Sequence, residues 1–186
     1  MLTPGDAEAL PCLGLQHSGD RVARKRAPTI FSTAGMPGSA TSLPDPFHLS
    51  RFVQAQEGIY ERALAEIRGG RKRSHWMWFV FPQYAGLGFS AMSQEYAINS
   101  VEEARAYLNH PVLGPRLVEC AQGVLGVEGR TANQIFGSPD DMKLRSSATL
   151  FAHVTGAGNV FEQLLQKYFD SKPDPKTMQL LAISDG

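Results

Sequence analysis

Cysteine is scarce in this chain, and the scarcity limits its possible redox chemistry. Among 186 residues only Cys12 and Cys120 occur, and no Cys-x-x-Cys pair is present. A disulfide framework, a thiol-exchange centre and a cysteine zinc site are therefore not expected. A chain without disulfides fits a reducing compartment, so we predict a cytoplasmic protein.

An excess of charge of one sign is also lacking. Lys and Arg number 18, Asp and Glu number 18, and the formal net charge is +0. Proteins that bind duplex nucleic acid usually carry a clear excess of basic residues. The composition therefore predicts no duplex nucleic acid partner.

Long hydrophobic runs and metal-ligand patterns are absent from the sequence as well. The most aromatic run, from Trp76 to Phe81, is far shorter than the ~20 residues that span a bilayer. The first residues contain no continuous apolar stretch typical of a secretory signal, so no membrane partner is predicted. The five histidines are dispersed, without a His-x-x-x-His pair or an acidic calcium loop. We therefore predict no metal and no cofactor.

The first 44 residues differ in composition from the rest of the chain. They are rich in Gly, Pro, Ser and Thr, and Phe31 is their only aromatic residue. Such a segment buries too little apolar surface to offset the entropy lost on ordering. Residues 1–44 are therefore predicted to be a disordered tail, and residues 45–186 a single all-α domain.

Start and stop signals divide this domain into about six or seven helices. Asp45-Pro46, the capping box Ser100-x-x-Glu103 and Ser138-Pro139-Asp140-Asp141 are typical helix starts. The aromatic-rich segment 71–82 fits a buried helix or a buried strand, and we favour a helix because no partner strand is evident. The expected helices cover about 45–68 (bent or split at Gly58), 71–82, 100–109, 112–125, 138–154, a segment opening at Asn159, and 174–181.

The segment from Arg71 to Gln83 is the first candidate site. Arg73 could hold a phosphate, Trp76 or Trp78 could stack on a flat base, and His75 could transfer a proton near neutral pH. Gln83 adds an amide to the same segment. In the alternative interpretation the cations are a solvated helix end and the tryptophans belong to the core.

A second candidate site combines Asp140, Lys143, Ser146 and Ser147. Their spacing places Asp140, Lys143 and Ser147 on one face of a helix, with Ser146 beside them. Lys143 could activate Ser147 as a nucleophile, or Lys143 and the hydroxyls could bind a ligand. A simple surface ion pair between Asp140 and Lys143 is the minimal alternative. The nearby Gly86-x-Gly88-x-x-Ala91 resembles a dinucleotide fingerprint, but no βαβ pattern surrounds it, so its glycines are expected to serve a close turn.

These two segments resemble the signatures of a known protein family. The sequences are Lys72-Arg73-Ser74-His75-Trp76-Met77-Trp78-Phe79-Val80-Phe81-Pro82-Gln83 and Lys143-Leu144-x-Ser146-Ser147-x-Thr149-Leu150-Phe151. The family consists of uncharacterised small conserved proteins, sometimes labelled "calpastatin", and the resemblance covers about Asp45 to Leu181. It implies an all-α fold and no established activity. The chain departs from the family pattern at Ala148, where Met is expected.

Two hypotheses for function remain open. In the first, the two segments meet in one site that binds a phosphate-bearing nucleotide-like molecule such as ADP-ribose or NAD. A stronger version of this hypothesis adds that the site hydrolyses the molecule. Arg73, Trp76, Trp78, Gln83, Lys143 and Ser146 would bind this ligand, and His75 and Ser147 would be catalytic. In the second, the domain is a non-enzymatic interaction or regulatory module whose aromatic and cationic residues form a protein interface.

Overall fold

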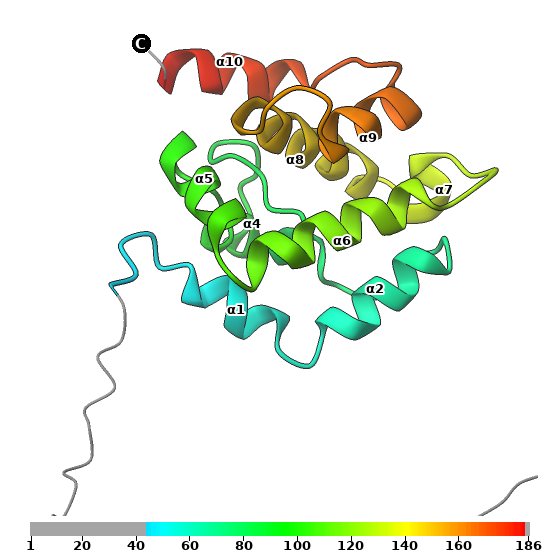
Figure 1. Ribbon diagram of the computed structural model, residues 1–186, viewed down its shortest axis with the longest axis horizontal. Helices are drawn as coiled ribbons and strands as arrows, with labels where there is room; N and C mark the ends of the chain where they lie inside the picture. Colours follow the sequence, from blue (N-terminus) through cyan, green and yellow to red (C-terminus); the bar gives the residue numbers. More distant parts are fainter. Residues whose placement is uncertain (1–43, 185–186) are drawn as a thin grey trace, which may run out of the picture. The chain divides into compact units, whose positions relative to one another are not determined.

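Helices make up nearly all of the regular structure in residues 44–184, the part of the chain that this computed structural model describes (Figure 1). Within that range the only β contact is an isolated bridge between Tyr84 and Ile98. The all-α prediction is therefore confirmed, whereas the tail predicted for residues 1–44 lies outside the described range except for Pro44. The helices are α1 (Ser50–Gln56), α2 (Tyr60–Arg68), α3 (Met77–Val80), α4 (Ala91–Glu95), α5 (Val101–Asn109), α6 (Leu113–Leu125), α7 (Ala132–Phe136), α8 (Asp140–Val154), α9 (Val160–Phe169) and α10 (Pro175–Ser184).

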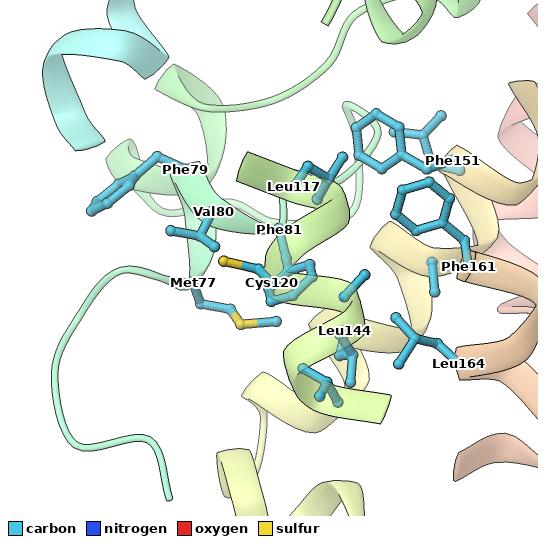
Figure 2. Close-up of a cluster of buried hydrophobic side chains, with 14 of the residues drawn as sticks. Met77, Phe79, Val80, Phe81, Leu117, Cys120, Leu144, Phe151, Phe161 and Leu164 are labelled. Atoms are coloured by element: carbon cyan, nitrogen blue, oxygen red, sulfur yellow. The ribbon is translucent and has the colours of Figure 1, made fainter. Parts of the chain in front are cut away.

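Helices α6 and α8 form the centre of the domain. α6 contacts α2, α3, α5 and α9, while α8 contacts α5, α7, α9 and α10. Between them lies an apolar core that includes Met77 and Phe81 near α3, Leu117 and Cys120 on α6, and Leu144 on α8 (Figure 2). None of the described helices has the length and apolar character needed to cross a membrane.

Asp45 accepts hydrogen bonds from the start of the first helix, but it lies five residues before the first helical residue, Ser50. Its carboxylate oxygens accept the backbone N–H groups of Leu49 and Ser50 at 2.7 and 2.9 Å. α1 therefore begins at Ser50, and the predicted helix start directly after Asp45, with Pro46 as its first residue, is wrong. Gly58, with a φ of 67°, separates α1 from α2, which confirms the split that the sequence allowed.

The aromatic-rich segment is helical for only one turn, α3. The Glu66 carboxylate in α2 accepts the backbone N–H groups of Arg73 and Ser74 and the indole N–H of Trp76. These bonds hold the chain in a non-helical path until Trp76, so the helix begins at Met77. The prediction of a helix over 71–82 is therefore correct in type at Met77–Val80 but wrong in extent, because Glu66, which holds residues 73–76 in another path, lies outside the segment.

The predicted start of α8 is only partly correct. The helix begins at Asp140, with Asp140 and Asp141 in its first turn, where the helix dipole favours acids. No side chain caps it, and Pro139 precedes the first helical residue, so the predicted Ser138 cap is wrong. Asn159 and Asp174 do start α9 and α10, which confirms both predictions. The Asn159 side chain accepts the backbone N–H groups of Phe161 and Glu162, and the Asp174 carboxylate accepts the backbone N–H of Thr177.

Two short helices were not predicted. α4 is capped by the hydroxyl of Ser90, and α7 carries a complete capping box between Thr131 and Gln134. The Thr-x-x-Gln pattern of the sequence could have predicted the capping box of α7. The sequence of α4 offers only the Ser90 cap, and the helix has no buried residue.

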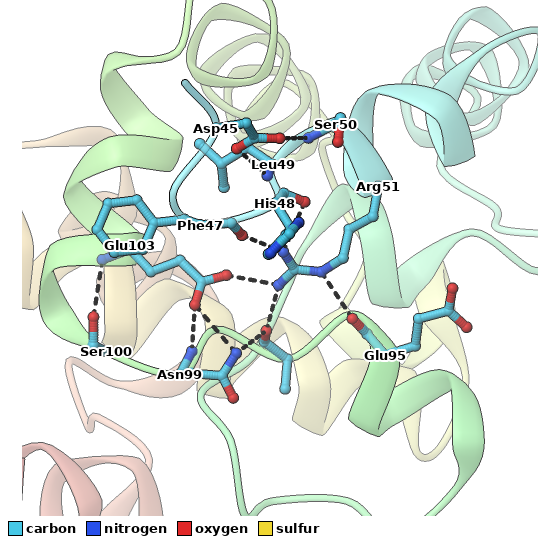
Figure 3. A network of polar contacts seen from close by, with 11 residues as sticks. Asp45, Phe47, His48, Leu49, Ser50, Arg51, Glu95, Asn99, Ser100 and Glu103 are labelled. Carbon is cyan, nitrogen blue, oxygen red and sulfur yellow. Dashed lines mark hydrogen bonds and ion pairs between the residues drawn. The ribbon is translucent and has the colours of Figure 1, made fainter. Parts of the chain in front are cut away.

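The predicted capping box of α5 is half formed, because Glu103 is used elsewhere (Figure 3). The Ser100 hydroxyl accepts the N–H of Glu103 at 3.1 Å, as expected. The Glu103 carboxylate instead accepts from Arg51 at 2.6 Å and from the backbone N–H of Asn99 at 2.9 Å. The buried acid thus joins α5 to α1 and does not cap its own helix.

Candidate functional site

Trp78 and Lys143, which belong to different predicted segments, lie in direct contact. The Lys143 Nζ atom is 4.4 Å from the centroid of the Trp78 ring. Trp78 lies in α3 and Lys143 in the first turns of α8, so the packing of these helices creates the contact. A cation over an indole face is stabilised by the ring quadrupole, which fixes the position of the ammonium group.

Asp140 holds this lysine and a second one. Its carboxylate forms ion pairs of 2.6 Å with both Lys143 and Lys72, and the three side chains are between 8% and 19% exposed. Burial alone would raise the pKa of Asp140, but the hydrogen bonds and charges of Lys143 and Lys72 outweigh it and lower that pKa. Two ammonium groups and one carboxylate leave one positive charge, so this cluster favours an anionic ligand.

A surface pocket of about 420 Å³ opens beside the Lys143 ammonium group. Four of the predicted ligand-binding residues line it together: Trp78, Gln83, Lys143 and Ser146. The Ser146 hydroxyl donates to the carbonyl of Met142 at 3.1 Å, and its oxygen can still accept a hydrogen bond. The structure therefore brings the two predicted segments to one hollow.

Four other predicted site residues do not line this pocket. Trp76 is completely buried, and its indole N–H donates to Glu66 at 2.8 Å, so no face of its ring is open to a ligand. Ser147 is 1% exposed, and its hydroxyl has no hydrogen-bond partner among the described residues. Arg73 and His75 are exposed to solvent. The structure thus does not bring His75 and Ser147 together in the pocket.

Sequence reasoning missed the other side of the pocket. Phe89, Ser90 and Ser93 come from the loop before α4 and its first turn, and Asp174 and Lys176 from the start of α10. The helix start at Asp174 is predicted correctly, but nothing in the sequence shows that it faces Trp78. The Phe89 loop carries a weak signal, namely an aromatic residue between Gly88 and Ser90, where turns rather than core segments are expected.

The charges around the pocket favour anions. Lys143 and Lys176 line it beside one acid, Asp174, whose Oδ2 atom accepts the backbone N–H and the hydroxyl of Thr177 at 2.8 and 2.7 Å. Within residues 44–184 no group of three or more His, Cys, Asp or Glu side chains is arranged to hold a metal ion. The polar side chains that line the pocket are two lysines, three serines, Gln83 and Asp174.

Comparison with known proteins assigns the chain to a family. A family model described as "Protein of unknown function (DUF1810)" matches residues 46–181. The chain belongs to this family. Among solved structures it is similar to the conserved hypothetical protein Rv1873 from Mycobacterium tuberculosis, with 55% identity and a TM-score of 0.73. The match covers 74% of this chain and 99% of that one, and no curated protein matches. Neither the description of the family nor that of the Rv1873 protein names an activity.

Proposed function

We propose that this DUF1810 domain binds a small phosphate-bearing, nucleotide-like molecule, in the class of ADP-ribose or NAD, in the pocket beside Lys143. The observation that carries the proposal is the meeting of Trp78 and Gln83 with Lys143 and Ser146 in one pocket. These residues come from segments some sixty positions apart in the chain. Hydrogen-bonding side chains grouped at a surface pocket are typical of a ligand site and are not required to pack a hydrophobic core.

The chemistry of the lining suits a phosphate group. Lys143 supplies a positive charge that Asp140 and Trp78 hold at the pocket wall. The hydroxyls of Ser90, Ser93 and Ser146 and the amide of Gln83 offer neutral hydrogen-bonding groups. Charge-assisted hydrogen bonds to phosphate are about twice as strong as neutral ones, so Lys143 is expected to contribute most of the affinity for the anion.

The proposal covers binding and not hydrolysis. His75 and Ser147 are the residues for which the sequence suggests a catalytic role, and neither lines the pocket. Ser147 is closed off from solvent by the packing of α8. The enzymatic form of the hypothesis therefore has no support from the geometry of these two residues.

A thermal-shift experiment with Lys143→Ala tests the proposed site. The full chain is screened against AMP, ADP-ribose, NAD and ribose 5-phosphate. A ligand at about 100 times its dissociation constant stabilises the fold by roughly 2.7 kcal/mol. We expect Lys143→Ala to abolish this stabilisation but to remain folded, because Lys72 still pairs with Asp140.

Lys172→Ala is the matched control for this variant. Lys172 is 71% exposed, lies far from Trp78 in the chain and pairs with the exposed Asp170. Its removal should leave every ligand shift unchanged. If none of the compounds stabilises the wild-type chain, or if Lys143→Ala and Lys172→Ala respond equally, the proposed function is wrong.

A protein-interaction role is the second candidate, and one observation favours it. Phe89 and Met142, at the pocket, are 85% and 47% exposed. Exposed apolar side chains grouped around a hollow are typical of interfaces. This alternative predicts that Met142→Ser weakens binding to a protein partner and that Lys143→Ala changes it little, the reverse of the order expected for a phosphate ligand.

A further inference from the structure

Phe89 is the most exposed large apolar side chain in residues 44–184. Its side chain is 85% exposed and lies at the pocket. An exposed phenylalanine contributes little burial energy to the fold. What distinguishes Phe89 is its position, because the exposed ring lies at the pocket together with Lys143 and Lys176.

The backbone that carries Phe89 is tightly held. A Cβ atom on the preceding Gly88 would lie 2.7 Å from Cβ and Oγ of Ser93, so the loop is pressed against the first turn of α4. The side-chain amide of Gln94 donates to the carbonyl of Phe89 at 3.5 Å, and the Ser90 hydroxyl accepts the N–H of Ser93 at 3.2 Å. The ring thus projects from a loop that packs against the first turn of α4.

Phe89 is also the aromatic side chain of the pocket that is most open to a ligand. The Lys143 ammonium group already occupies one face of the Trp78 ring, and Trp78 is itself half-buried. Lys176 lies 5.9 Å from the centroid of the Phe89 ring, near the outer limit of a cation–π contact. Because the Lys176 side chain is exposed, it can move from the ring toward an anion.

From this geometry we infer that Phe89 is the stacking platform for the flat base of the ligand, with Lys176 as a second contact to its phosphate groups. The inference rests on the proposed function and deepens it, since it selects nucleotides over simple sugar phosphates. Stacking requires only a flat ring on both partners, so the site would discriminate weakly between bases. Trp78 then acts mainly by positioning Lys143.

Binding of AMP and ribose 5-phosphate to the full chain, measured by calorimetry, tests this role. The two compounds share a phosphate and a ribose, and only AMP carries a base. We expect AMP to bind on the order of ten-fold tighter, a difference of about 1.4 kcal/mol, because only AMP carries a base that can stack on the Phe89 ring. In Phe89→Ala and in Phe89→Leu this preference should fall to about two-fold or less, whereas Phe89→Trp should retain it.

Ile183→Ala provides the control, since Ile183 is a 71% exposed apolar residue that does not line the pocket. It should keep the ten-fold preference for AMP. If Phe89→Ala keeps the preference while Lys143→Ala still abolishes binding of both compounds, the stacking role is wrong and the proposed function stands. If neither AMP nor ribose 5-phosphate binds the wild-type chain, the role of Phe89 is wrong, whereas the proposed function fails only if ADP-ribose and NAD also give no thermal shift.

Discussion

At the scale of single residues, Glu66 decides the path of the segment that leads into the site. Its carboxylate accepts four hydrogen bonds, from the N–H groups of Arg73 and Ser74, the Ser74 hydroxyl and the Trp76 indole. Burial alone would raise the pKa of Glu66, but these donors outweigh it and lower the pKa to about 2. The ordinary value is 4.5, so the folded protein prefers the charged carboxylate.

This preference predicts how stability depends on pH. A depressed folded-state pKa contributes stability above the ordinary pKa, which is lost as the pH falls toward the folded value. We expect Glu66→Gln to lower the free energy of unfolding by roughly 1–3 kcal/mol near neutral pH. The difference from wild type should shrink between about pH 4.5 and pH 2. Urea denaturation across this range measures it.

Glu61→Gln is the matched control, because Glu61 lies on the same helix but is exposed. It should change the stability by less than about 1 kcal/mol, the contribution of an exposed acid in the first turn of a helix. A difference between wild type and Glu66→Gln that stays constant down to pH 2 would contradict the role assigned to the carboxylate.

At the scale of helices, local signals predict the start of an element well and its path through the fold poorly. Asn159 and Asp174 begin helices because each side chain supplies a cap within its own turn. The path of α3 depends instead on Glu66, and the pocket depends on the packing of α8 beside α3. Both are contacts between segments distant in the chain, which no local sequence pattern predicts. Phe89 and Lys176 were not predicted at the pocket because contacts of this kind place them there.

The corner between α5 and α6 illustrates a backbone contact with a testable cost. A Cβ atom on Gly114 would lie 1.9 Å from the carbonyl oxygen of Leu108, a distance that forces the backbone to move. We expect Gly114→Ala to destabilise the fold by roughly 3 kcal/mol or more, because the obstacle is backbone rather than a movable side chain. Gly156→Ala is the control, since nothing lies within 4 Å of a Cβ there. Equal melting temperatures for the two variants would contradict this account.

At the scale of the whole domain, Arg51 fastens the first helix to the rest of the fold (Figure 3). Its guanidinium group donates to acceptors from three parts of the chain: the carbonyls of Phe47 and His48, the carbonyls of Glu95 and Ala97, and the carboxylate of Glu103. The Glu103 side chain is only 4% exposed, and Arg51 is the cation paired with its buried carboxylate.

Arg51→Met therefore leaves a buried carboxylate without its cation. We expect a loss of roughly 3–5 kcal/mol in the free energy of unfolding, the range seen when one member of a buried ion pair is removed. Chemical denaturation compares it with Arg62→Met, an exposed arginine on α2 that should cost less than about 0.5 kcal/mol. A loss below about 1 kcal/mol in Arg51→Met would contradict the role assigned to Arg51 in holding the first helix.

The shared use of Asp140 by two lysines has a consequence for exchange at the pocket. Lys72 stays paired with the carboxylate at 2.6 Å whichever partner Lys143 contacts, so the charge of Asp140 remains balanced. In the proposed binding mode Lys143 can therefore turn toward an anion while it stays beside Trp78, and no helix has to separate from its neighbours. We expect the residence time of the proposed ligand to be set by the strength of its contacts and not by a gate.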